Sequence, residues 1–148
     1  MSERTTAADV LGIAITLEIN GKASLFVRLA ADGTINRMGK GTRDTTDREL
    51  FIGRVDGAIF QAVLSHVTED MLKTTGQTFQ TETQRGDVCK LTVGFLFKDS
   101  TSGGFALLYG SNSAGVPGDV RSLVTAAVRE TDQWYENFKR NTAQEPQP

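Results

Sequence analysis

The stretch VLGIAITLEINGKASLFVRLA, residues 10–30, decides the fold class of this chain. Apolar residues alternate with small or polar ones on both sides of Asn20-Gly21, and this two-residue period is typical of β-strands with one buried face. Asn and Gly tolerate the positive φ angles that both central positions of a type I′ turn require. The stretch therefore predicts an antiparallel hairpin. Its expected buried face consists of Leu11, Ile13, Ile15, Leu17 and Ile19, then Ala23, Leu25, Val27 and Leu29.

A second hairpin is expected in residues 88–109. Residues 88–98 alternate in the same way, and a loop rich in Ser and Gly, residues 99–104, leads into a return strand at 105–109. The expected buried face of this hairpin consists of Cys89, Leu91, Val93, Phe95 and Phe97, then Phe105, Leu107 and Tyr109.

Shorter elements surround the two hairpins. Ile35 points inward in a third strand, Asp56 can cap a helix that begins near Gly57, and Thr68 can cap a further helical turn. Gly76 is a suitable stop signal after that turn. The expected segments are strands at 34–38 and 77–83, a strand or extended lead-in at 50–55, a helix with an apolar face from Ile59 to Val67, and a helical turn at 69–73.

A long amphipathic helix of about 20 residues is expected from Asp119 onwards, since apolar residues recur there every three or four positions. The expected stripe is Val120, Leu123, Val124, Ala127, Val128, Thr131, Trp134, Tyr135 and Phe138. Hairpins with helices between them predict an α+β fold with an antiparallel sheet of about six strands in two units, in the order β-β-β-α-β-β-β-α. The long C-terminal helix then packs on one face. We expect a flexible N-terminus at 1–9, one domain at 10–140 and a flexible C-terminal tail at 141–148.

Length, net charge and the lengths of the apolar stretches indicate which kinds of partner to expect. The 148 residues fit one domain, and the net charge of −2 gives no general attraction to nucleic acid or anionic membranes. The longest apolar stretches are near ten residues, too short for a membrane span, and no secretory signal precedes the first strand. We therefore expect a cytoplasmic protein without membrane or nucleic-acid partners.

Catalytic chemistry finds little support in the sequence. His66 is the only histidine and Cys89 the only cysteine, so a two-histidine metal site and an intramolecular disulfide are excluded. Cys89 falls in an apolar run, which favours a buried, unreactive thiol over a catalytic one. No phosphate-binding lysine motif occurs in the loop at 110–118. The sequence thus identifies no catalytic residue, no metal site and no cofactor.

An anion site is a second hypothesis. Gly115 and Gly118 precede the last helix, where backbone N–H groups and the helix dipole favour negative charge. Arg37 and Lys40 stand among glycines and could add positive charge. The simpler interpretation is a plain strand-to-helix connection at 110–118 and a solvated polar loop at 39–49.

The second face of the predicted strands is the stronger signal. It carries Gly12, Ala14, Phe26, Leu96, Ala106 and Leu108 among Thr16, Glu18, Ser24, Arg28 and Lys98. This mixture is too apolar for plain solvent surface and too polar for a second core. Phe26, Leu96 and Leu108 are therefore candidate interface residues for a protein partner or for a second copy of the chain, with a homodimer as the commonest arrangement. The competing interpretation is that residues 39–49 fold over this face.

Two function classes follow from these patterns. We expect a small non-enzymatic protein-interaction module of the adaptor, regulator or inhibitor type. The alternative is a small-molecule or anion-binding protein, or an enzyme, with its site in loops 39–49 and 110–118.

Overall fold

The structure is a computed structural model that describes residues 7–41, 49–80, 85–112 and 116–143. The two expected termini therefore lie partly outside the described residues, and so do parts of loops 39–49 and 110–118. A short 3-10 helix at Ala7–Asp9 precedes ten further elements. They are β1 (Val10–Ile19), β2 (Lys22–Ala30), β3 (Thr34–Gly39), β4 (Phe51–Arg54), α1 (Ala58–Leu64), α2 (Glu69–Lys73), β5 (Thr78–Gln80), β6 (Val88–Phe97), β7 (Ser102–Gly110) and α3 (Gly118–Ala143).

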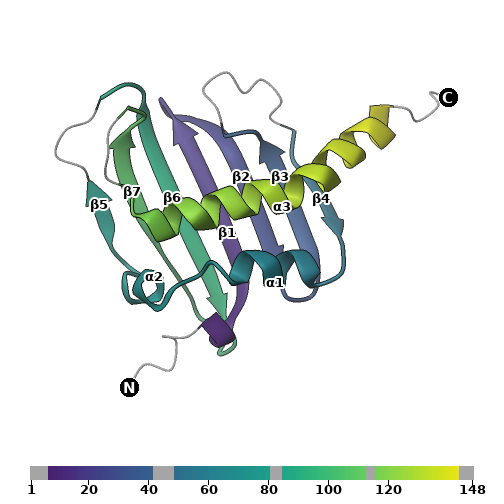
Figure 1. Cartoon of the computed structure of the whole chain (residues 1–148), viewed down its shortest axis with the longest axis horizontal. Coiled ribbons are helices and arrows are strands. Elements are labelled where there is room, and N and C mark those ends of the chain that lie inside the picture. Colours follow the sequence, from purple (N-terminus) through teal and green to yellow (C-terminus); the bar gives the residue numbers. More distant parts are fainter. Residues whose placement is uncertain (1–6, 42–48, 81–84, 113–115, 144–148) are drawn as a thin grey trace.

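The described strands form one sheet in the order β4-β3-β2-β1-β6-β7-β5. The α-helices lie on one side of it, and α3 crosses most of the strands (Figure 1). The predicted α+β class is confirmed. The sheet has a seventh strand, and β5 runs parallel to β7 whereas every other pair is antiparallel. The chain passes through β6 between β5 and β7, which gives it the length that a parallel neighbour requires.

The Asn20-Gly21 turn is confirmed, with φ angles of 52° and 81°. A register shift follows it, so that Leu17 pairs with Leu25 but Glu18 pairs with Ala23. Ala23 therefore shares a face with Glu18, which corrects its expected place on the apolar face. The Asn20 side chain also joins β1 to the start of β6, because its Oδ1 accepts the Val88 N–H at 3.0 Å.

The hydrophobic core lies between the sheet and the helices. Ile15, Val27, Ile35 and Val93 are fully buried on the helix-facing side of the central strands. From α3, the buried side chains recur every three or four residues, as the sequence predicts: Val120, Leu123, Ala127, Thr131 and Tyr135. Val124, Val128 and Trp134 pack at the border of this core. Trp134 lies over Gly53 of β4, where a Cβ atom would come within 2.7 Å of the ring.

Some element boundaries differ from expectation. β7 begins at Ser102 rather than Phe105, because Gly103 and Gly104 continue the ladder opposite Phe95 and Gly94. The helix after Asp56 ends at Leu64, although Val67 is buried beyond it. The last helix has 26 residues rather than about 20. Among the described residues, no helix is both long and apolar enough to cross a membrane.

Candidate functional site

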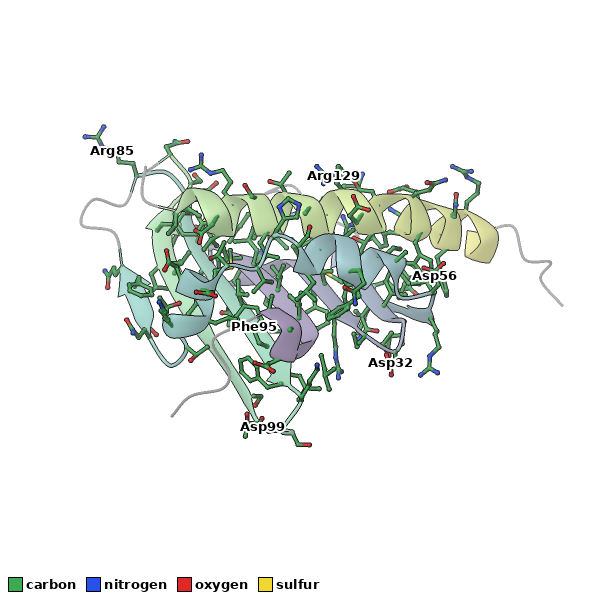
Figure 2. All side chains as sticks on the ribbon, turned by 60° about the horizontal axis from the view of Figure 1, so that its bottom comes forward. Asp32, Asp56, Arg85, Phe95, Asp99 and Arg129 are labelled. Atoms are coloured by element: carbon green, nitrogen blue, oxygen red, sulfur yellow. The ribbon has the colours of Figure 1, made fainter. Side chains whose placement is uncertain are left out.

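The sheet has a second face, directed away from the helices, which we call the open face. The three α-helices lie on the opposite side of the sheet (Figures 1 and 2). Alternate residues of four central strands line the open face, as the strand registers place them. They are Gly12, Ala14, Thr16 and Glu18 of β1, Ala23, Phe26, Arg28 and Ala30 of β2, Val88, Lys90, Thr92, Gly94 and Leu96 of β6, and Ser102, Gly104, Ala106 and Leu108 of β7.

A hollow of about 470 Å³ lies on the open face, where three neighbouring strands carry small residues. Gly94 pairs with Ala14 on one side and with Gly104 on the other. Gly104 has no room for a side chain, since a Cβ atom there would collide with the Val93 carbonyl oxygen. Gly94 has open space above it, with no heavy atom closer than 3.9 Å to a Cβ position. The space above Gly94 is therefore left by the absence of a side chain, whereas Gly104 is required by the close approach of β7 to β6.

Three charged side chains of β1, β2 and β6 lie on the open face. Arg28 is exposed on β2 and lines the hollow. Glu18 of β1 and Lys90 of β6 are register partners on the same face. None of the three forms a salt bridge with another described residue. Their charges are thus available to a molecule that approaches the open face.

The three candidate interface residues all lie on the open face, but the structure does not bring them together. Phe26 is half-buried on β2, Leu96 is 40% exposed on β6, and Leu108 is half-buried on β7. From strand spacing and rise, their Cα atoms are roughly 16 Å or more apart. Between them lie the small residues of the hollow and the exposed Thr92.

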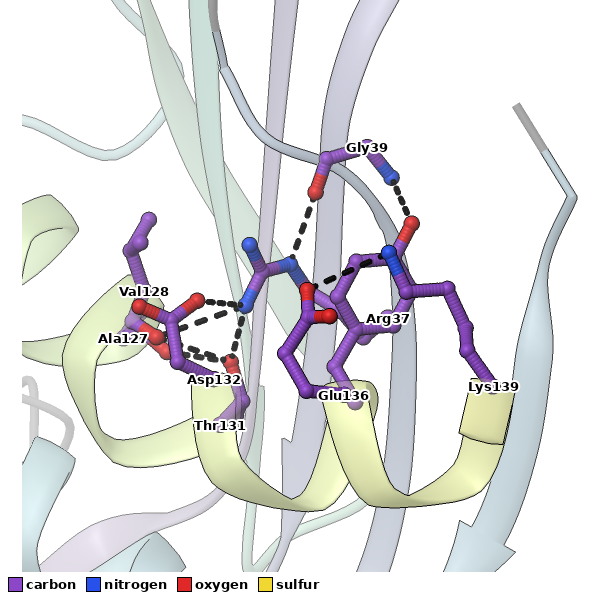
Figure 3. Close-up of polar contacts among 9 residues, drawn as sticks. Arg37, Gly39, Ala127, Val128, Thr131, Asp132, Glu136 and Lys139 are labelled. Atoms are coloured by element: carbon purple, nitrogen blue, oxygen red, sulfur yellow. Dashed lines mark hydrogen bonds and ion pairs between the residues drawn. The ribbon is translucent and has the colours of Figure 1, made fainter. Parts of the chain in front are cut away.

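Arg37 is not the accessible cation that the anion-site hypothesis requires. It is 1% exposed on the helix-facing side of β3, two residues from Ile35. Its Nη1 donates to Asp132 Oδ1 at 2.8 Å and to Thr131 Oγ1 at 2.9 Å, and its Nε donates to the Gly39 carbonyl oxygen at 3.0 Å (Figure 3). The guanidinium also lies 4.6 Å from the centre of the Tyr135 ring. The alternation that places Ile35 inward could have identified Arg37 as buried.

The described residues of the predicted anion site do not form one site. Arg37 and Lys40 line a cleft of about 400 Å³ together with Asp132, Gln133 and Glu136, so carboxylates share the cleft with the two cations. Gly118 begins α3, whereas Arg37 contacts residues 128–135, at least ten residues or about 15 Å further along the helix. Gly115 lies outside the described residues.

The two side chains most often associated with catalysis lie apart from the open face. His66 is half-buried after α1. Cys89 is buried on the helix-facing side of β6 beside Tyr109, and burial together with the Asp87 carboxylate raises the pKa of its thiol. Within the described ranges, no group of three His, Cys, Asp or Glu side chains is arranged to hold a metal ion.

Comparison with known proteins gives no further guide. No protein-family model, no curated protein and no solved structure matches this chain.

Proposed function

We propose that the protein is a small interaction module that binds a protein partner through the open face. The observation that carries this proposal is the contrast between the two faces of one sheet. The helix-facing side is covered by α1, α2 and α3, whereas the open face presents Phe26, Leu96 and a hollow of about 470 Å³. Exposed surfaces that mix apolar and charged side chains are typical of protein interfaces.

The cleft at Arg37 supports a function less well. Four groups already hold the Arg37 guanidinium in place, and Asp132 neutralises its charge. These contacts join β3 to α3 and thereby stabilise the fold. On the open face, no salt bridge to another described residue holds Arg28, Glu18 or Lys90.

Photo-cross-linking tests the proposal without knowledge of the partner. A photoreactive benzoylphenylalanine would replace Thr92, which is exposed at the centre of the open face. The control would carry the same group in place of Arg129, which projects from the outer side of α3 (Figure 2). After irradiation in cells that express the chain, we expect a discrete protein adduct from position 92 and none from position 129. Absence of an adduct from position 92, or equal adducts from both positions, would overturn the proposal.

A further inference from the structure

We infer that the partner on the open face is a second copy of this chain, related by a two-fold axis that runs across the strands through Phe26, Thr16, Thr92 and Ala106. This inference rests on the proposed function and adds the identity and register of the partner. A two-fold axis that exchanges two stacked sheets lies in the plane between them. It brings each row of residues against the row equally far away on the other side of the axis.

The strand registers define these rows. Thr16 pairs with Phe26 and with Thr92, and Thr92 pairs with Ala106, which gives the central row. A flanking row lies on each side of the central row. Each flanking row is about 7 Å from the central row along the strands, or about two residues. The first flanking row is Arg28, Ala14, Gly94 and Gly104, and the second is Ala23, Glu18, Lys90 and Leu108.

Charge is complementary between the two flanking rows. The axis brings Glu18 of one copy over Ala14 of the other, one strand away from Arg28. One strand spacing is about 4.8 Å, which a flexible Arg side chain can span. Symmetry repeats the contact, so two Arg28–Glu18 pairs form for each dimer. Both residues lack a salt bridge within the described part of their own chain.

Shape is complementary between the same rows. The axis brings Leu108 of one copy over Gly104 of the other, where the hollow is open. It brings Lys90 over Gly94, and the missing side chain there leaves room for the aliphatic stem of the lysine. Each copy thus fills the hollow of the other with side chains that its own open face presents.

A third match lies further from the axis, on β6 alone. Leu96 and Val88 are 40% and 54% exposed, and each stands four residues from Thr92, on opposite sides. The axis through Thr92 therefore brings Leu96 of one copy towards Val88 of the other. Symmetry repeats this contact, so both exposed apolar residues of each copy would become covered.

The size of the contact fits a reversible dimer. Four strands about 4.8 Å apart, over roughly eight residues of about 3.4 Å each, present about 500 Å² per subunit. The total of about 1,000 Å² is at the lower limit of specific interfaces. Twisted sheets pack with their strands about 30° apart. This rotation displaces the matched residues sideways by no more than about one strand spacing. We therefore expect a dissociation constant in the micromolar range.

Sedimentation equilibrium of the purified chain tests self-association. The mass should rise from 16.0 kDa towards twice that value with concentration, over about 5 to 500 µM. Added salt should weaken the dimer, because the ion pairs at its border are screened. A constant mass of one chain across this range would overturn the homodimer. A Thr92 adduct with a different protein would then leave the proposed interaction function intact.

Charge exchange tests the register. Arg28→Glu alone brings two acidic side chains together at each contact, and Glu18→Arg alone brings two basic ones together. Each variant should weaken its own dimer about tenfold or more, because like charges oppose one another. A one-to-one mixture should recover dimers, since every contact is then between opposite charges. Recovery is expected only for this register. If both variants dimerise like the parent, or if the mixture does not recover, the axis is wrong although the open face could still be an interface.

Gly94→Leu tests the hollow with a variant that should fold. A side chain at this position meets no atom of its own chain closer than 3.9 Å at Cβ but fills the space opposite Lys90. We expect the melting temperature to be unchanged or higher and the dimer to weaken about tenfold. Arg129→Glu on the outer side of α3 is the control, with mass and melting temperature unchanged. A Gly94→Leu protein that dimerises like the parent would show that the hollow is not covered.

Discussion

Arg37 Nη1 lies 2.8 Å from Asp132 Oδ1, and this ion pair joins β3 to the second half of α3. The two partners differ in environment, since the Arg37 side chain is 1% exposed and that of Asp132 is 54% exposed. A guanidinium so deeply buried needs its charge compensated and its donors satisfied. Thr131 and Val128 accept further hydrogen bonds from Nη1, and Gly39 accepts one from Nε. Together these contacts tie β3 to the second half of α3.

The first prediction follows from that pair. Asp132→Ala leaves the Arg37 charge without its counter-ion, and water that reaches the half-exposed site compensates only in part. We expect the free energy of unfolding to fall by about 2 kcal/mol in urea denaturation. Glu130→Ala, two residues away on the same helix, removes an acid that pairs with the exposed Arg129. That control should cost less than about 1 kcal/mol, and equal losses in both variants would contradict the special role of Asp132.

Local signals in the sequence predict much of this fold. The alternation around Asn20-Gly21 identifies both strands of the first hairpin and its turn, and the spacing of apolar residues after Asp119 identifies α3. Both patterns depend only on neighbours along the chain. The parallel pairing of β5 with β7 could not be predicted, because β5 pairs with β7 rather than with β6, the next strand along the chain, and no local pattern specifies that choice.

The candidate site is predictable only in part. Alternation assigns Phe26, Leu96 and Leu108 to one face, but their separation depends on the pairing of β1 with β6, which joins the two hairpins. No sequence pattern around Gly94 or Gly104 predicts a hollow. They face one another only because β6 and β7 pair in one register, so a shift of one residue would move every side chain to the other face.

The second prediction separates backbone strain from packing at Gly21. Neither Gly21 nor Gly118 has a heavy atom within 4 Å of a Cβ position, but only Gly21 has a positive φ angle, of 81°. Gly21→Ala should lower the free energy of unfolding by about 1 kcal/mol, because the left-handed conformation is strained for an L-residue with a Cβ atom. Gly118→Ala should leave it unchanged or raise it by a few tenths of a kcal/mol. Equal effects in thermal unfolding would contradict the type I′ turn.

The third prediction concerns the pH dependence of stability above pH 9. Burial, with a smaller effect of the Asp87 carboxylate, raises the pKa of the Cys89 thiol above its ordinary value of 9.0. The unfolded thiol therefore loses its proton at a lower pH than the folded one. Above that value the unfolded state binds fewer protons, so stability falls as pH rises towards the folded pKa.

Cys89→Ala supplies the comparison for this effect. Its free energy of unfolding should fall less steeply between pH 8 and about pH 10 than that of the parent, because Ala has no titrating group. Urea denaturation at several pH values measures both slopes. Identical slopes would show that the thiol is as accessible in the folded protein as in the unfolded chain.

The last prediction distinguishes the two glycines that form the hollow. Gly104→Ala places a Cβ atom against the Val93 carbonyl oxygen, so β7 must move away from β6. We expect a loss of about 2 kcal/mol or more from this overpacking. Gly94→Ala meets no such contact and should leave stability unchanged or raise it by about 0.5 kcal/mol, since Ala restricts the unfolded chain. Thermal unfolding of both variants checks the difference. If this difference in stability is found, the close packing of β6 and β7 explains the glycine at position 104. Gly94 is then not needed for folding, and the space above Gly94 is left for a partner. Equal losses in the two variants would mean that the hollow is a consequence of strand packing.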